Sequence, residues 1–296
     1  MKVLITGSGS YIGRNIKAWL ENTDEFIVDE LDMENPDWIN YDFRPYDTVI
    51  HVAAIVHRKN KIPWSTYYKV NTILPYKVAK KARESHVEQF VFFSSMAVYG
   101  QGKKLPMGNI IDEKTKLIPK NHYGRSKLAA EIKIQKLSTQ DFKISILRPS
   151  NIYGYGCPGN YISSFVKLVR LTPVIPVIYR DCKQGLLYID NLCSFIYQLI
   201  VDRKEGVFHP QDGEGISTFE LISEIADLTH KKVVYSSILG KIISYFHKVP
   251  LVIKIFGGVS YSRSLSKRPY NNYSTVDFKN GLMKTISTPK NDTEKP

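Results

Sequence analysis

The first twenty residues constrain the fold of this chain more than any other segment. An apolar run at residues 3–6 leads directly into the glycine-rich sequence at residues 7–13, and a helical stretch continues to Leu20. A strand, a glycine turn and a helix in this order begin a βαβ unit, in which backbone amides and the helix dipole can meet a pyrophosphate. The segment therefore predicts an α/β fold that binds a dinucleotide.

The rest of the first half continues this alternation of strands and helices. Runs of Val, Ile and Phe with few charges are typical of strands that are covered on both faces. The expected strands cover residues 3–6, 26–31, 48–52, 90–94 and 144–147, and the expected helices cover residues 12–20, 66–85 and 123–137. Residues 32–47 are too few for a full helix and another strand, so this connection is expected to be abbreviated. The predicted class is α/β, a Rossmann-type doubly wound parallel sheet.

The composition of the sequence changes after about Arg148, where loops rich in Gly, Pro and Tyr begin. Such segments suit a smaller, substrate-facing unit. We predict a dinucleotide-binding Rossmann domain at residues 1–150 and a mainly substrate-binding C-terminal domain at residues 151–287, from which the chain can return to the sheet. The polar residues 288–296 are predicted to form a flexible tail.

The net charge indicates which partners to expect, and the cysteine content indicates the cellular location. The formal net charge of +13 favours polyanions, which include nucleic acids, anionic membrane surfaces and diphosphates. Because the basic residues are spread along the chain and no nucleic-acid-binding motif is present, a nucleic-acid partner is not expected. The three cysteines are odd in number and form no C-x-x-C motif, so neither a disulfide framework nor a zinc site is suggested. The apolar run at the N-terminus is too short for a signal peptide, and a cytoplasmic location is expected.

The most apolar late segment covers residues 238–259. Lysines and a proline interrupt it, so it lacks the continuous stretch of about 20 apolar residues that a transmembrane helix needs. Packing against the C-terminal domain is the favoured interpretation, and a basic amphipathic surface helix that makes a peripheral membrane contact is the alternative.

The glycine-rich loop and two acidic residues form the predicted cofactor site. Asp32, at the end of the second expected strand, is spaced to accept hydrogen bonds from the adenosine ribose, which favours NAD and leaves NADP open. Asp29 could take this place if the strand ends earlier, and Asp42 is expected near the adenine. The loop residues expected at the cofactor are Gly7, Ser10, Tyr11, Ile12 and Gly13.

Tyr123 and Lys127 are four residues apart on an expected helix and therefore share one face. A tyrosine, whose ordinary pKa is about 10, needs a nearby positive charge to act as a base near neutral pH, and Lys127 can supply it. Ser95 ends a buried strand, where its hydroxyl can orient a reacting oxygen. Together the three residues predict a hydride-transfer site.

The order of these motifs resembles that of the NAD-dependent epimerase/dehydratase family, the extended short-chain dehydrogenases that act on nucleotide sugars. The matching pieces are TGSGSYIG at residues 6–13, HVAA at 51–54, the helix with Asn71, FFSSMAVYG at 92–100, YGRSK at 123–127 and LRPSNIYG at 147–154. One departure is Ser10, which stands where the family usually has its middle glycine, and its Cβ is expected to crowd the phosphates.

The resemblance assigns roles to residues of this sequence. It implies that Ser95 is the catalytic Ser/Thr, that Tyr123 is the general acid/base, and that Lys127 holds the nicotinamide ribose and lowers the tyrosine pKa. Further residues that the resemblance places at the cofactor are Ala53, Ala54 and Asn71. Those that it places at the substrate are Ser95, Tyr99, Asn151 and Asn160.

The residues after Ser95 bear on the reaction. A 4,6-dehydratase of this family has an Asp-Glu pair there, whereas this chain has Met96 and Ala97, which argues against dehydration. The resemblance implies a 4-epimerase or a 4-keto-6-deoxy-sugar reductase that acts on a UDP-linked hexose or N-acetylhexosamine for surface-polysaccharide precursors. It also implies a homodimer. A non-catalytic NAD(P)-binding sensor or assembly protein is the alternative from another class.

Overall fold

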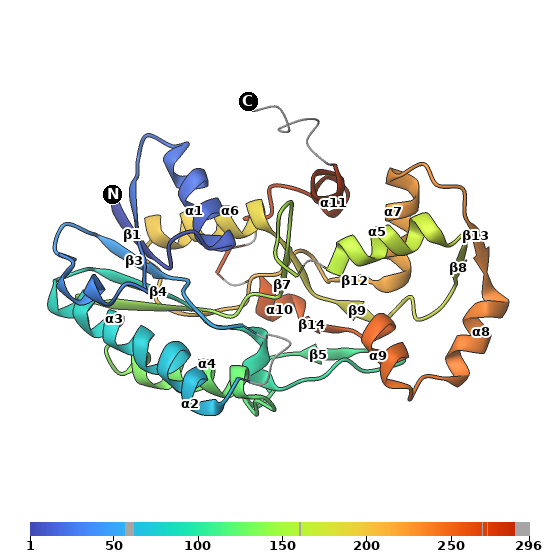
Figure 1. Ribbon diagram of the computed structural model, residues 1–296, viewed down its shortest axis with the longest axis horizontal. Helices are drawn as coiled ribbons and strands as arrows, with labels where there is room; N and C mark the ends of the chain where they lie inside the picture. Colours follow the sequence, from blue (N-terminus) through green and yellow to red (C-terminus); the bar gives the residue numbers. More distant parts are fainter. Residues whose placement is uncertain (57–61, 160, 268, 271, 288–296) are drawn as a thin grey trace.

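Six parallel strands form the central sheet of the computed structural model, in the order β11-β6-β4-β3-β1-β2 (Figure 1). The structure describes residues 1–56, 62–159, 161–267, 269–270 and 272–287. Among the described residues, all five pairs of neighbouring strands in this sheet are parallel. The strands are β1 (Lys2–Thr6), β2 (Ile27–Leu31), β3 (Thr48–His51), β4 (Gln89–Phe93), β6 (Lys143–Leu147) and β11 (Gly206–Phe208). Because β2 lies on one side of β1 and β3, β4, β6 and β11 follow on the other side, the crossovers wind in two directions, as the sequence predicted.

Helices cover both faces of this sheet. α1 (Tyr11–Glu21) and α6 (Ile189–Val201) pack on one face, and α3 (Leu74–Glu84) and α4 (His122–Gln135) pack on the other (Figure 1). The inner strands β1, β3 and β4 are almost wholly buried because both of their faces meet helices. Two large apolar clusters, one on each face, form the core. The predicted doubly wound α/β class is therefore confirmed.

Two expected elements take a different form. The helix expected at residues 66–85 consists of α2 (Trp64–Tyr68), a π-helical turn at Lys69–Ile73 and α3. The abbreviated connection after β2 contains a 3-10 turn at Pro36–Asn40, whose Trp38 is buried in the core. A short turn that inserts one large aromatic side chain thus replaces a full covering helix.

The C-terminal half contains small sheets and short helices. Its paired strands are β7 (Asn151–Tyr153) with β10 (Leu186–Tyr188), β8 (Val174–Pro176) with β13 (Val234–Ser236), β9 (Lys183–Gln184) with β12 (Ile216–Ser217), and β14 (Val259–Tyr261) with β5 (Asn109–Ile111). Its other helices are α5 (Tyr161–Leu171), α7 (Thr218–Leu228), α8 (Ser237–Tyr245), α9 (Pro250–Phe256), α10 (Arg263–Ser266) and α11 (Phe278–Ile286). Through β11, which pairs with β6, the chain returns to the central sheet.

The apolar segment at residues 238–259 forms α8, α9 and the first residue of β14. Its inward side chains pack on the C-terminal half, where Phe256 joins a small cluster with Leu105, Ile178 and Cys182. Within the described ranges, no helix has the length and apolar character needed to span a bilayer. The domain boundary near residue 150 remains a prediction, and the tail predicted at residues 288–296 lies outside the described residues.

Candidate active site

The glycine-rich loop after β1 lies against the loop after β3. Gly7 has a φ of +117°, and a Cβ there would lie 2.8 Å from the backbone nitrogen of Ala53, so a side chain would force the two loops apart. The amides of Gly7 and Ser8 both donate to the carbonyl of Leu31 at the end of β2. Two predicted cofactor residues, Gly7 and Ala53, therefore meet at the carboxyl edge of the sheet, where such folds bind ligands.

Ser10 is the residue at which the loop departs from the usual family pattern. It is the N-cap of α1, and its Oγ accepts a hydrogen bond from the amide of Gly13 at 3.1 Å. Its φ of −68° lies in an ordinary region, so a serine causes no backbone strain there. Ser10 thus starts the helix, and crowding of the phosphates by its Cβ remains a prediction.

Tyr11 and Ile12 lie at the junction between the two halves. Both pack against the apolar cluster that α6 shares with α1. The Tyr11 hydroxyl lies close to the backbone of Gly154, just after β7. Burial raises the pKa of the Tyr11 phenol. These two side chains therefore tie the beginning of α1 to the C-terminal half, and direct contact with the cofactor remains a prediction for both.

The carboxylate that contacts the glycine-rich loop in the described structure is that of Glu30. Its Oε1 accepts a hydrogen bond from the amide of Gly9 at 3.2 Å. Asp29 instead accepts a hydrogen bond from Tyr46 at 2.7 Å and pairs with Lys2 at 3.4 Å. A charged residue inside a strand was the signal for Glu30, but the sequence did not reveal which of the neighbouring carboxylates faces the loop.

Asp32 and Asp42 use their carboxylates in local contacts. Asp32 is exposed just after β2, and its Oδ1 accepts from the amide of Glu34 at 2.8 Å. Arg44 donates to both oxygens of Asp42, at 2.9 and 2.8 Å, and these bonds lower the pKa of that carboxyl to about 2. The contacts of both residues with the ribose and adenine remain predictions.

Replacement of Glu30 by glutamine is expected to lower NAD affinity by about tenfold, because an amide oxygen is a weaker acceptor than a carboxylate for the Gly9 amide and holds the glycine-rich loop less firmly. The matched variant Asp32→Asn is expected to have a smaller effect. Titration calorimetry with NAD and NADP measures both affinities for each variant. A larger loss in Asp32→Asn than in Glu30→Gln would assign the ribose to Asp32, as the sequence suggested.

Asn71 lies in the π-helical turn and is fully buried. Its Oδ1 accepts from the amide of Ile55 at 2.8 Å, and its Nδ2 donates to the Ile55 carbonyl at 2.9 Å and to Ser126 Oγ at 3.2 Å. Such π-turns are frequent at functional sites. Asn71 thus holds the segment that carries Ala53 and Ala54 against α4, and its predicted contact with the cofactor is untested.

Ser95, Tyr123 and Lys127 come from two elements that meet at the sheet edge. Ser95 follows β4, and the other two lie in the first turns of α4. Burial raises the pKa of Tyr123, and a hydrogen bond with the Ser95 side chain lowers it by a smaller amount. The phenol and the hydroxyl are therefore adjacent, so a single substrate oxygen can reach both.

Lys127 is fully buried beneath this pair. Its Nζ donates to the Phe93 carbonyl at 2.6 Å and lies 4.8 Å from the centre of the Phe92 ring. Burial lowers the pKa of Lys127 to about 7, and the Glu131 carboxylate opposes this shift. The Tyr123 pKa responds to burial, Ser95 and Tyr67, so its lowering by Lys127 remains a prediction.

The two serines after β4 have different partners. Ser94 donates to the Glu131 carboxylate and is buried. Ser95 accepts from the amide of Ala97 at 3.2 Å, begins the 3-10 turn at Met96–Tyr99 and contacts Tyr123. Successive residues of an extended segment point to opposite sides, so only the second serine can serve the site.

A buried polar network adjoins the site and was not predicted. Arg148 donates to Glu131 from Nε at 3.0 Å and from a terminal nitrogen at 2.6 Å, and it also donates to the Tyr99 hydroxyl at 2.9 Å. The Tyr99 hydroxyl shares a further hydrogen bond of 2.7 Å with His209. Tyr99 was expected to contact the sugar, but it is buried and its hydroxyl is engaged on two sides. Its contact with the sugar remains a prediction.

The other predicted substrate residues lie in the C-terminal half. Asn151 begins β7 on the surface, and its Nδ2 donates to the Gly185 carbonyl at 3.0 Å. Asn160 lies outside the described residues. A sugar contact by either residue remains a prediction.

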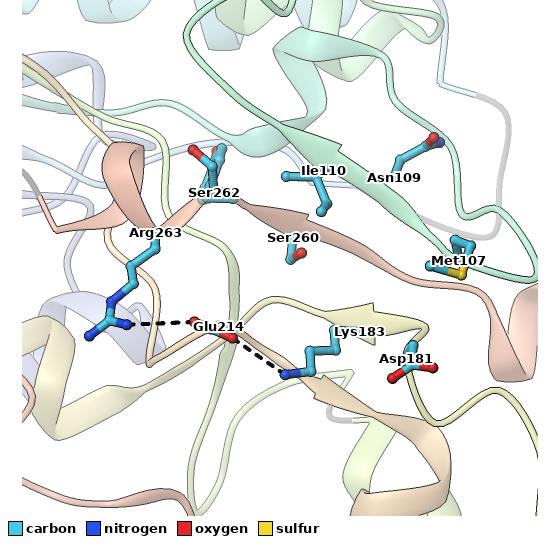
Figure 2. Close-up of a pocket in the computed structure, with 10 residues that line it drawn as sticks. Met107, Asn109, Ile110, Asp181, Lys183, Glu214, Ser260, Ser262 and Arg263 are labelled. Atoms are coloured by element: carbon cyan, nitrogen blue, oxygen red, sulfur yellow. Dashed lines mark ion pairs between the residues drawn. The ribbon is translucent and has the colours of Figure 1, made fainter.

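Figure 2 shows a cavity of about 350 Å³ between β5, β14 and β9. Glu214 lies between two cations there, 3.6 Å from Lys183 and 3.8 Å from Arg263. The cavity is lined by Met107, Asn109, Ile110, Asp181, Lys183, Glu214, Ser260, Tyr261, Ser262 and Arg263. None of these residues was predicted for the site, and the lining does not include Ser95, Tyr123 or Lys127.

Comparisons with known proteins agree with this geometry. The model of the NAD dependent epimerase/dehydratase family matches residues 3–209. A UDP-glucose 4-epimerase of Vibrio cholerae is 31% identical over 248 residues, which cover 76% of this chain and 74% of that protein. Both the glycine-rich loop and the Ser, Tyr and Lys cluster lie inside the matched region.

Two further similar proteins differ in their substrates. The N-acetyl-alpha-D-glucosaminyl-diphospho-ditrans,octacis-undecaprenol 4-epimerase of Escherichia coli O157:H7 is 26% identical over 249 residues, covering 78% of this chain and 73% of that protein. The crystal structure of a dTDP-4-dehydrorhamnose reductase from Clostridium acetobutylicum superposes with a TM-score of 0.71 at 22% identity, covering 97% and 98% of the two chains. At that identity the structural similarity shows the fold alone.

Proposed function

The chain belongs to the NAD dependent epimerase/dehydratase family, and we propose that within this family it transfers a hydride at C4 of a UDP-linked hexose or N-acetylhexosamine, as a 4-epimerase or a 4-keto-6-deoxy-sugar reductase. The observation that carries the proposal is the half-buried Tyr123, whose phenol is hydrogen-bonded to Ser95 and which lies one turn from Lys127. A protein that only senses a cofactor does not require this arrangement.

The residues at the sheet edge fit a dinucleotide. Gly7 allows the loops after β1 and β3 to approach, the N-terminus of α1 offers amides to a diphosphate, and Glu30 places a carboxylate at the loop. When bound, NAD supplies the acceptor and the donor of the hydride. Tyr123 would remove the proton from the substrate hydroxyl and return it, while Ser95 would hydrogen-bond the same oxygen. Lys127 would hold the ribose and keep a positive charge near the phenolate.

Substrates carried by a lipid are a second candidate class. The Escherichia coli relative is named for a sugar on undecaprenyl diphosphate. Exposed apolar side chains on α8 and α9 favour the same class here, because a lipid-linked sugar must be reached at a membrane surface. The hydride chemistry at Ser95 and Tyr123 would be unchanged, since only the group beyond the diphosphate differs.

Product analysis distinguishes these reactions. The purified protein is incubated with UDP-glucose, UDP-N-acetylglucosamine, a UDP-4-keto-6-deoxy sugar or undecaprenyl-diphosphate N-acetylglucosamine, with NADH or NADPH added to the keto sugar. Inversion at C4 without net change in cofactor absorbance is expected of an epimerase. Stoichiometric oxidation of the reduced cofactor by the keto sugar is expected of a reductase. If all substrates are unchanged in the presence of bound NAD, the catalytic proposal is wrong and a binding protein is the better account.

A further inference from the structure

The outer face of α8 carries large apolar side chains where a surface helix normally carries polar ones. Ile238, Ile242 and Tyr245 are 75%, 51% and 84% exposed, and their spacing of four and three residues places them in one stripe. The opposite side of the helix packs on the protein through Gly240, where a Cβ would collide with the backbone of Val177. The close packing at Gly240 therefore fixes which side of α8 faces solvent, and that side carries the apolar stripe.

This apolar surface continues past the end of α8. Phe246 and Val249 in the connecting turn and Leu251 in α9 are also exposed. We call these side chains the α8–α9 face, which consists of Ile238, Ile242, Tyr245, Phe246, Val249 and Leu251. Figure 1 shows α8 and α9 in the half of the molecule away from the central sheet, with α8 at its outer end. A contiguous apolar patch on a surface marks an interaction site, whereas single exposed apolar residues do not.

The chain segment that contains the α8–α9 face carries charge of one sign. Residues 228–276 contain eight Lys or Arg residues and no Asp or Glu. Lys241, Lys248 and Lys254 lie within or beside the face and are exposed. Long lysine side chains can extend past apolar groups so that their ammonium groups reach a polar boundary. The face therefore combines apolar surface with positive charge and lacks acidic residues.

The apolar surface and the positive charge together indicate what binds to the α8–α9 face. A second copy of this face would bring lysines against lysines without a carboxylate to neutralise them, so self-association through it is disfavoured. The surface of an anionic bilayer offers phosphates to the lysines and an acyl boundary to the apolar side chains. The helices have nine and seven residues, too few to span a bilayer but suited to lie along its surface.

We propose that the α8–α9 face docks on the surface of an anionic membrane. In this orientation the apolar side chains enter the headgroup boundary, and Lys241, Lys248 and Lys254 contact lipid phosphates. The C-terminal half, which carries Asn151, is then the half that approaches the lipid. The inference goes beyond the proposed reaction and does not depend on which sugar is the substrate.

Vesicle flotation with the full chain tests the apolar contribution. Wild-type protein is expected to float with vesicles of phosphatidylcholine mixed with phosphatidylglycerol and to bind phosphatidylcholine alone weakly. Ile238→Ser/Ile242→Ser is expected to lower the partition constant by about tenfold or more. The matched control Ile27→Ser/Ile39→Ser changes two isoleucines that are 65% and 58% exposed in the other half, and it is expected to bind like wild type.

Charge reversal tests the electrostatic contribution. Lys241→Glu/Lys248→Glu is expected to abolish measurable binding to the anionic vesicles, because each lysine near such a surface contributes roughly fivefold. Lys116→Glu/Lys136→Glu makes the same change in net charge at exposed sites outside the face and is expected to retain binding. Added salt should weaken wild-type binding. Circular dichroism melting verifies that each variant is folded.

Two results would overturn the docking proposal. One is failure of the folded wild-type protein to bind anionic vesicles. The other is equal loss of binding in the face variants and in their matched controls. If sedimentation velocity shows a dimer that Ile238→Ser/Ile242→Ser dissociates, and vesicles do not bind, the face belongs to a second copy instead. Turnover of a soluble UDP-sugar should be unchanged in the face variants, so failure of docking and failure of the proposed reaction are distinguishable.

Discussion

Replacement of Tyr123 by phenylalanine is expected to lower turnover by about 10²- to 10⁴-fold, because it removes the group that exchanges a proton with the substrate. The change deletes the phenolic oxygen that is hydrogen-bonded to Ser95 and leaves the half-buried ring in place. NAD affinity is expected to remain close to wild type, since the cofactor loop and Glu30 are untouched. Turnover is measured with the substrate that the product analysis identifies, and affinity is measured by calorimetry.

A matched control for this variant is Tyr67→Phe. Tyr67 is also a buried tyrosine, and its ring packs on His122 beside the site. It is expected to retain most of the activity, because Tyr67 has no assigned proton transfer and its effect, a raised Tyr123 pKa, is the smallest of the causes that act on that group. Retention of more than about a tenth of wild-type turnover in Tyr123→Phe would remove this tyrosine from the role of general acid/base.

The pH dependence of Ser95→Ala gives an independent measure of the same contact. The hydrogen bond from Ser95 lowers the pKa of Tyr123 by favouring the phenolate, whereas burial raises it. Loss of the hydroxyl should therefore move the acidic limb of the pH–rate profile to higher pH, in addition to lowering the rate. A merely structural serine would change the rate without moving the limb.

Replacement of Arg148 by methionine is expected to destabilise the protein by about 3–5 kcal/mol, because it leaves a carboxylate buried without its cation. Glu131 and Arg148 are both almost fully buried, and two hydrogen bonds of 3.0 and 2.6 Å join them. The same carboxylate also opposes the lowering of the Lys127 pKa. Urea unfolding, followed by fluorescence, measures the change in the free energy of unfolding.

A double variant separates the cost of the orphaned charge from loss of packing. Glu131→Leu/Arg148→Met removes both charges and is expected to recover most of the stability lost in Arg148→Met. The exposed pair of Arg44 and Asp42 is the control, and Arg44→Met should leave the unfolding free energy unchanged because solvent screens that pair. A loss in Arg148→Met no larger than in Arg44→Met would contradict a buried structural ion pair.

Much of the fold could be predicted because its signals are local. The five strands expected in the first half all form, within one or two residues of their expected ends. Four of them are mainly apolar runs that need cover on both faces, whereas β2 lies at the edge of the sheet and carries two acidic residues. Spacing along α4 placed Tyr123 and Lys127 on one face. The small sheets of the C-terminal half were not predicted, because their strands are two or three residues long and leave no periodic pattern.

The sequence by itself determined the parallel sheet, its glycine-rich loop and the chemical groups of the candidate site. These depend on periodicity and on residues a few positions apart. Only the tertiary structure decided that Glu30 faces the loop, that Tyr99 is engaged by Arg148, and that α8 presents its isoleucines to solvent. Each of these facts depends on which side of an element meets a distant part of the chain, and that is set by the packing of whole elements rather than by local preference.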